Sequence, residues 1–134
     1  MIAYCRPKIK KLNSKEAQVL IPLKRRTKNH FNSMYFGALS IGADFTAGLL
    51  VVHLLKKHNS KAKLLFKDFN ANFIKRANSN VLFLCSDNEL IETSILKNLK
   101  SKKRVNFKVK VDAVCRDVGE QFKIANFFLT TSIK

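Results

Sequence analysis

The pattern of hydrophobic and polar positions is dominated by one long apolar run, residues 34–55, in which Asp44 is the single charged residue. Asn32 and Ser33 precede the run and are good N-cap residues for a helix that begins near its first position. Lys57 follows the run, at the end of the helix where a cation complements the helix dipole. We therefore predict a helix that is apolar on nearly every side, which must either cross a membrane or lie inside a protein core.

Shorter segments on both sides of this helix alternate between apolar and polar residues, which is the pattern of half-buried strands. A change of parity between Phe66 and Phe69 indicates a β-bulge or a bend. A second helix is predicted over residues 89–99, capped by Asp87 or Asn88. The predicted strands cover residues 8–12, 17–24, 61–76, 81–85, 105–116 and 121–133, with a hairpin turn at 117–120.

These elements predict an α+β fold in which one antiparallel β-sheet wraps around a long central α-helix. A membrane span is not expected, because Asp44 would be costly at mid-depth and the amphipathic strands would have no core without this helix. By its length, the chain is expected to form a single domain over residues 1–134.

The net charge of +17 points to a polyanionic partner or to a heavily solvated surface. The 26 basic residues are spread along the chain, and most of them are Lys. Specific nucleic-acid sites favour clustered Arg, so a nucleic-acid partner is disfavoured, although a phosphate-bearing ligand stays open. The basic run at residues 24–28 is expected to be solvated.

The cysteines bear on compartment and on metal binding. Cys5, Cys85 and Cys115 are odd in number and far apart, which favours reduced, buried thiols and a cytoplasmic location. No signal peptide is expected, because residues 1–13 are basic and lack an apolar core. The sequence has no metal-ligand cluster and no phosphate-binding glycine loop, so neither a metal nor a cofactor is expected.

Candidate chemistry lies on one stripe of the long helix. Gly37, Ser40, Asp44 and Gly48 are three or four residues apart and so share a face. An acid in a groove lined by small residues could act as a general base that activates water. Backbone N–H groups near Gly37, in the first helical turn, could hold a developing oxyanion. The alternative, that Asp44 faces a dimer interface or solvent, is equally compatible with the pattern.

The order of elements and three motifs resemble the hotdog-fold thioesterases, in particular the phenylacetyl-CoA thioesterase type and its uncharacterised relatives. The first motif is NHFNSMYFGALSIGAD at residues 29–44, in which an acid follows a glycine by seven positions. The second is FNANFIKRA at residues 69–77, and the third is the hairpin at residues 111–125. Tyr35-Phe36 stand where the family has His-Gly.

This resemblance implies a catalytic set at the start of the helix. Asp44 would be the general base or the nucleophile on a thioester carbonyl, and Gly37 would offer its backbone N–H to the thioester oxygen. Asn29 and His30 match an Asn-His pair of the less studied relatives and are included as candidate catalytic residues.

The resemblance also implies an acyl-CoA substrate and a homodimer or dimer of dimers with the site at the subunit interface. Phe36 and Ser40 are expected to contact the substrate, and Lys75 and Arg76 its CoA phosphates. The strand at residues 81–85 is expected where the sheets of two subunits join.

Two other functions stay open. The first is a non-catalytic hotdog protein that binds a fatty acyl or acyl-CoA ligand. The second is a basic nucleic-acid-binding module, which a steep loss of affinity with salt would reveal.

Overall fold

The computed structural model describes residues 2–117 and 119–134, which form six strands and three α-helices with one short 3₁₀ helix. The elements are α1 (Ile2–Cys5), β1 (Lys8–Leu12), β2 (Ala17–Ile21), η1 (Arg25–Thr27), α2 (Phe36–Lys57), β3 (Leu64–Phe73), β4 (Val81–Cys85), α3 (Asn88–Ser101), β5 (Val105–Asp117) and β6 (Glu120–Ile133).

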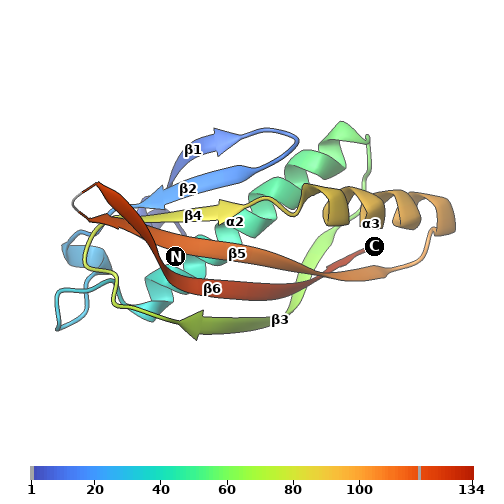
Figure 1. Ribbon diagram of the computed structural model, residues 1–134. Coiled ribbons are helices and arrows are strands. Elements are labelled where there is room, and N and C mark those ends of the chain that lie inside the picture. Colours follow the sequence, from blue (N-terminus) through green and yellow to red (C-terminus); the bar gives the residue numbers. More distant parts are fainter. Residues whose placement is uncertain (1, 118) are drawn as a thin grey trace.

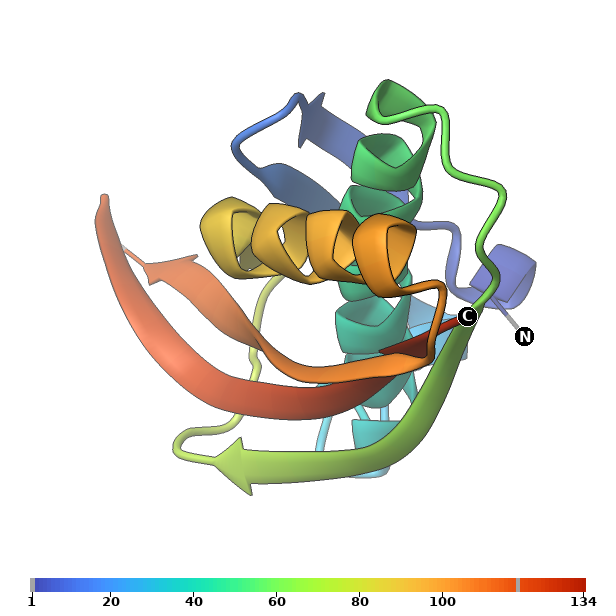
Figure 2. The ribbon, with the colours of Figure 1, turned by 90° about the vertical axis from the view of Figure 1, so that its right-hand side faces the viewer.

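The strands form one antiparallel sheet in the order β1-β2-β4-β5-β6-β3. Figure 1 shows β5 and β6 as a long hairpin along the sheet, with β3 beside β6 and β1 at the opposite edge. The sheet curls around α2, and α3 lies across the same side of the sheet (Figure 2). The predicted α+β fold, one antiparallel sheet wrapped around a long central helix, is confirmed.

The sheet and α2 approach each other most closely at one glycine. A Cβ on Gly42 would fall within the ring of Phe83, a fully buried residue of β4. Since no side chain separates backbone from ring there, the helix packs directly on the centre of the sheet. Ala38, Ala43, Ala47 and Leu50 of α2 are also fully buried.

By length and composition α2 is the one helix of the described chain that could cross a bilayer, and 56% of its most apolar window is buried within the fold. Burial against the sheet explains its apolar sequence as that of a core helix.

The long helix begins two residues later than predicted, at Phe36 instead of near Met34. The backbone N–H of Met34 donates to the carbonyl oxygen of Ala77 (2.9 Å), which holds this residue in an extended segment. Asn32 has a left-handed φ of 63°, and the Ser33 hydroxyl donates to Asn78 Oδ1 (2.9 Å) instead of capping the helix. Tertiary hydrogen bonds therefore override the local N-cap pattern.

The expectation that β4 joins two subunits is wrong, because β4 lies inside the sheet between β2 and β5. The backbone of β4 is paired with β2 along one edge and with β5 along the other. The free edges of the sheet are β1 and β3. The predicted bulge is confirmed in β3, where the register with β6 shifts between Phe66 and Asp68.

Asp87 stands at the predicted N-cap position of α3, but its side chain makes no capping bond. Its carboxylate instead accepts the backbone N–H of Lys110 at 2.7 Å. The pairing of β4 with β5 ends at Leu84 and Asp112, so Asp87 satisfies a donor of β5 just beyond the ladder. Of the predicted turn at 117–120, Val118 lies outside the described residues.

Candidate functional site

Asp44 lies in a groove between α2, α1 and β3. The cavity has a volume of about 300 Å³. Its other lining residues are apolar or glycine: Ile2, Phe45, Gly48, Leu49, Val52 and Phe66. The groove therefore offers an acyl chain apolar walls and a single polar group.

The electrostatic surroundings of Asp44 favour its neutral form. Burial raises the pKa of its carboxyl above the usual range for aspartate, and no hydrogen bond or ion pair within the described residues lowers it again. A carboxylate with little solvation and no partner is a stronger base than one in water. The groove thus holds an acid whose raised pKa makes its carboxylate a better proton acceptor.

The first turn of α2 presents backbone donors. Among the described residues, the N–H groups of Phe36 and Gly37 have no backbone acceptor, whereas those of Ala38 and Leu39 both donate to the Tyr35 carbonyl (3.1 and 3.2 Å). The ring of Tyr35 covers the position where a Cβ of Gly37 would lie. The first turn therefore leaves an N–H at Gly37 that could stabilise an oxyanion.

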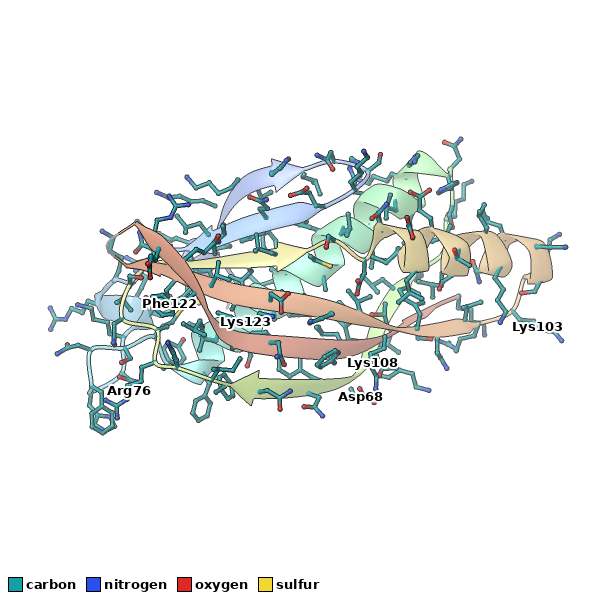
Figure 3. All side chains as sticks on the ribbon, in the orientation of Figure 1. Asp68, Arg76, Lys103, Lys108, Phe122 and Lys123 are labelled. Carbon is teal, nitrogen blue, oxygen red and sulfur yellow. The ribbon has the colours of Figure 1, made fainter. Side chains whose placement is uncertain are left out.

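A second cavity, of about 360 Å³, lies at the start of α2. Asn29, Phe36, Lys75 and Arg76 line it together, with Ser33, Met34, Leu39, Phe73 and Ile74. The guanidinium of Arg76 lies 4.5 Å from the centre of the Phe31 ring, and Lys75 Nζ lies 5.2 Å from that of Phe122. Figure 3 shows Arg76 at this end of the molecule, next to the loop that precedes α2. Both cations are thus held in place by aromatic rings.

Asn29 and His30 occupy this preceding loop. The side-chain oxygen of Asn29 accepts the backbone N–H groups of Phe31 (2.9 Å) and Ser33 (3.1 Å), which closes the loop. His30 is exposed, and its ring lies 4.0 Å from that of Phe31. The structure therefore gives Asn29 a part in shaping the approach to α2 and leaves His30 at the surface.

The structure distributes the predicted site residues over two places. Asn29, Phe36, Lys75 and Arg76 share the cavity at the start of α2, and Asp44 lies in the groove farther along the helix. Ser40 lies one turn from both Phe36 and Asp44 and is partly buried. Neither cavity includes Gly37, Ser40 or His30 in its lining.

The apolar walls of the Asp44 groove were missed from sequence. Gly48 of the predicted stripe does line the groove with Asp44, but Phe45, Leu49 and Val52 were not predicted as site residues. Ile2 and Phe66 come from distant segments, so helical periodicity could not have found them. Gly48 was within reach of that signal, because it follows Asp44 by four residues and so lies beside it on the helix.

Large apolar side chains are exposed at both cavities. At the start of α2, Phe36 is 72% and Phe73 49% accessible, and their ring centroids lie 5.6 Å apart. Val52 in the Asp44 groove is 39% accessible.

Comparison with known proteins identifies relatives of this architecture. A protein-family model described as "Domain of unknown function (DUF4442)" matches residues 2–125. No sequence among curated proteins matches the chain.

Solved structures match nearly the whole chain. A protein of unknown function from Chlorobaculum tepidum has a TM-score of 0.85 at 13% identity, covering 98% of this chain and 83% of its own. A thioesterase family protein from Silicibacter pomeroyi has a TM-score of 0.75 at 17% identity, with coverages of 98% and 87%. A mutant of a thioesterase enzyme from Staphylococcus aureus has a TM-score of 0.68 at 16% identity, with coverages of 99% and 97%. The chain shares the hotdog fold of these proteins.

Proposed function

The chain belongs to the family of the DUF4442 domain, and from its hotdog fold, its thioesterase-named structural neighbours and the site geometry we propose that it is an acyl-CoA thioesterase. The observation that carries the proposal is the Asp44 carboxyl, with its raised pKa, in an apolar groove on a helix whose first turn has a free N–H. Two of the structural neighbours above carry the name thioesterase.

The proposed reaction adds water to the thioester. The Asp44 carboxylate takes a proton from a water molecule while the oxygen of that water attacks the carbonyl carbon of the thioester. The N–H of Gly37 stabilises the oxyanion of the tetrahedral intermediate. The C–S bond then breaks, giving a carboxylic acid and CoA thiol, with the proton returned to the sulfur. Alternatively, the Asp44 carboxylate attacks the carbonyl itself, and the C–S bond breaks to release CoA as a thiolate and leave a mixed anhydride. Water then hydrolyses the anhydride, which frees the carboxylic acid and Asp44, and a proton from that water passes to the thiolate.

We place the complete site between two copies of the chain. Gly37 and Asp44 are seven residues apart, which separates their backbones by about 10 Å along one helix. If one N–H group and one attacking group act on the same carbonyl, each of them lies only about 3 Å from that carbonyl. Gly37 and Asp44 of one chain are too far apart for this. A partner that covers the groove would bring its own Gly37 close to Asp44 and would bury the exposed aromatic residues. The ten-residue edge strand β3 is the matching place for the two sheets to join.

This arrangement predicts a dimer that a charge in the groove would break. Val52→Lys is expected to convert the dimer into a monomer, because Val52 is accessible in the isolated chain and would be buried by the partner. Sedimentation velocity would measure the mass. Leu99→Lys on α3 is a matched control, since Leu99 is 41% accessible, and it should leave the dimer intact. A wild-type chain that sediments as a monomer would refute the shared site.

The pH dependence of hydrolysis tests the role of Asp44. Only the carboxylate form can accept a proton, so kcat/KM should fall as the pH drops through the pKa of Asp44. Because burial raises this pKa, the acid limb should lie above the ordinary aspartate pKa of about 3.9. Thiol release from a panel of acyl-CoA substrates would give the profile. A rate that stays flat down to the ordinary value would exclude Asp44 as the base.

The remaining assignments complete the proposal. Lys75 and Arg76 bind the phosphates of CoA, while Phe36 and Ser40 contact the acyl arm. The reaction needs water and no cofactor or metal. A single domain in the cytoplasm suits the three reduced and buried thiols.

A further inference from the structure

A third cavity, separate in its lining from the two above, is surrounded by positive charge. It has a volume of about 420 Å³ and lies where the end of α1 meets the turn after β2. Cys5 and Pro22, both buried, contribute to its wall. All of its other lining residues are cationic: Arg6, Lys8, Lys24, Arg25 and Arg26.

In the part of the chain that the structure describes, none of these five cations forms an ion pair with an acid. The first 43 residues contain nine Lys or Arg and one acid, Glu16, which pairs with Lys11 at 3.7 Å. Like charges around one concave site repel each other unless an anion binds there. Four of the five cations are exposed and Arg26 is partly buried, so the positive potential of the cavity favours anions most at low ionic strength.

The backbone that carries these cations is held in place by hydrogen bonds. The buried Thr27 hydroxyl donates to the Pro22 carbonyl (2.8 Å) and accepts the backbone N–H of Lys24 (2.9 Å). These two bonds close the turn that presents Lys24, Arg25 and Arg26. On the opposite side, Arg6 follows α1 in a left-handed conformation (φ 50°), with its N–H bonded to the Ala3 carbonyl (3.2 Å).

One guanidinium is also oriented by its neighbours. Arg26 lies 5.5 Å from the centre of the Tyr4 ring and donates to the Tyr4 carbonyl at 3.5 Å. This contact ties η1 to α1, which lie next to each other in Figure 2. Two segments far apart in the sequence thus bring their cations to one site in a defined arrangement, which lowers the entropic cost of binding an anion.

We propose that this cavity binds the diphosphate group of a nucleotide. Three Arg and two Lys exceed the charge of a single phosphate and match a group of two or more. The volume lies in the range of small-molecule sites and leaves room beyond one phosphate. The concave shape favours a compact ligand over the backbone of a nucleic acid, which would follow an open basic groove. The inference does not depend on the catalytic role of Asp44.

Calorimetric titration of the full chain with pyrophosphate at low ionic strength tests the proposal. The double variant Arg25→Ala/Arg26→Ala should bind pyrophosphate about tenfold or more weakly, because it loses two guanidinium forks. The control Lys97→Ala/Lys108→Ala removes the same charge from α3 and β5, outside the cavity, and should keep wild-type affinity; Figure 3 shows Lys108 on the sheet. Melting curves of both variants would show that each is folded.

Further ligands identify the source of the diphosphate. ADP and CoA both carry it, and pantetheine does not. If Arg25→Ala/Arg26→Ala weakens ADP and CoA alike, the cavity holds the nucleotide end of a CoA ligand. If ADP binding is lost while CoA binding persists, the cavity is a separate nucleotide site.

Two results would overturn the proposal. One is equal pyrophosphate affinity in the wild type and in the Arg25→Ala/Arg26→Ala variant. The other is an equal loss in the Lys97→Ala/Lys108→Ala control, together with tight and salt-sensitive binding of single-stranded RNA by the wild type. That second result would assign the charge to a polymer-binding surface.

Discussion

Asp44→Asn is expected to lower kcat/KM for acyl-CoA hydrolysis by about a thousandfold. Asparagine keeps the size and polarity of the side chain but cannot accept the proton from water. The variant should also be at least as stable as the wild type at neutral pH. A raised pKa means that the folded state disfavours the charged form of Asp44, so removing the charge removes a cost of folding. Thiol release and denaturant unfolding would measure the two quantities.

A second carboxyl provides the control for this variant. Glu89→Gln neutralises an exposed acid on α3, away from both cavities, and should leave the rate unchanged. Full activity of Asp44→Asn would remove Asp44 from the mechanism. If the wild type and Asp44→Asn are equally inert on the acyl-CoA panel but both bind a ligand, the chain is the non-catalytic binder considered above.

Isotope labelling separates the two roles open to Asp44. In a single turnover in ¹⁸O-labelled water, a nucleophilic carboxylate incorporates label into Asp44 when water attacks the side-chain carbonyl carbon of Asp44 in the anhydride. A general base directs the label to the product acid alone. Mass spectrometry of the peptide that contains Asp44 would distinguish these outcomes.

Gly42→Ala is expected to destabilise the fold by about 1–3 kcal/mol. Its new methyl group would overlap the ring of Phe83, which is fully buried in β4 and cannot move into solvent. Alanine favours the helical conformation by about 1 kcal/mol over glycine, but in this position the steric conflict is larger. Urea unfolding at a fixed protein concentration would measure the change.

Gly48→Ala is the matched control on the same helix. There the nearest atoms to a new Cβ belong to Phe66, at 3.9 Å, which is an ordinary contact. The substitution is expected to stabilise the protein by about 0.5–1 kcal/mol through helix propensity. Equal effects of the two substitutions would show that α2 does not pack on β4 at Gly42.

Local pattern was sufficient for most of the architecture. Alternation in β5 and the apolar run of α2 specify which faces are buried. An apolar helix flanked by amphipathic strands can be buried in few architectures other than against the apolar face of a sheet. The start of α2 and the capping of α3 were misplaced for one shared reason. Ser33 and Asp87 have cap-forming side chains, but both serve distant partners, Asn78 and Lys110.

The sequence pattern predicted only part of the candidate site. Asp44 stood out because a lone acid in an apolar helix needs an explanation, and its periodicity placed Gly37 and Ser40 on the same stripe. The groove walls Ile2 and Phe66 come from α1 and β3, whose positions depend on the whole chain. Three of the five cations of the third cavity, Lys24, Arg25 and Arg26, were expected to belong to a solvated run for the same reason, since Arg6 and Lys8 meet them only in the folded molecule.

The sequence by itself determined the elements, the buried faces and the unusual position of Asp44, because each follows from side chains that are neighbours along the chain. Tertiary structure alone decided the order of the strands, and with it that β3, and not β4, is a free edge. It also decided that Gly42 is the point of closest packing and which residues surround Asp44. These features depend on contacts between distant segments, and a one-dimensional pattern does not record which segments meet.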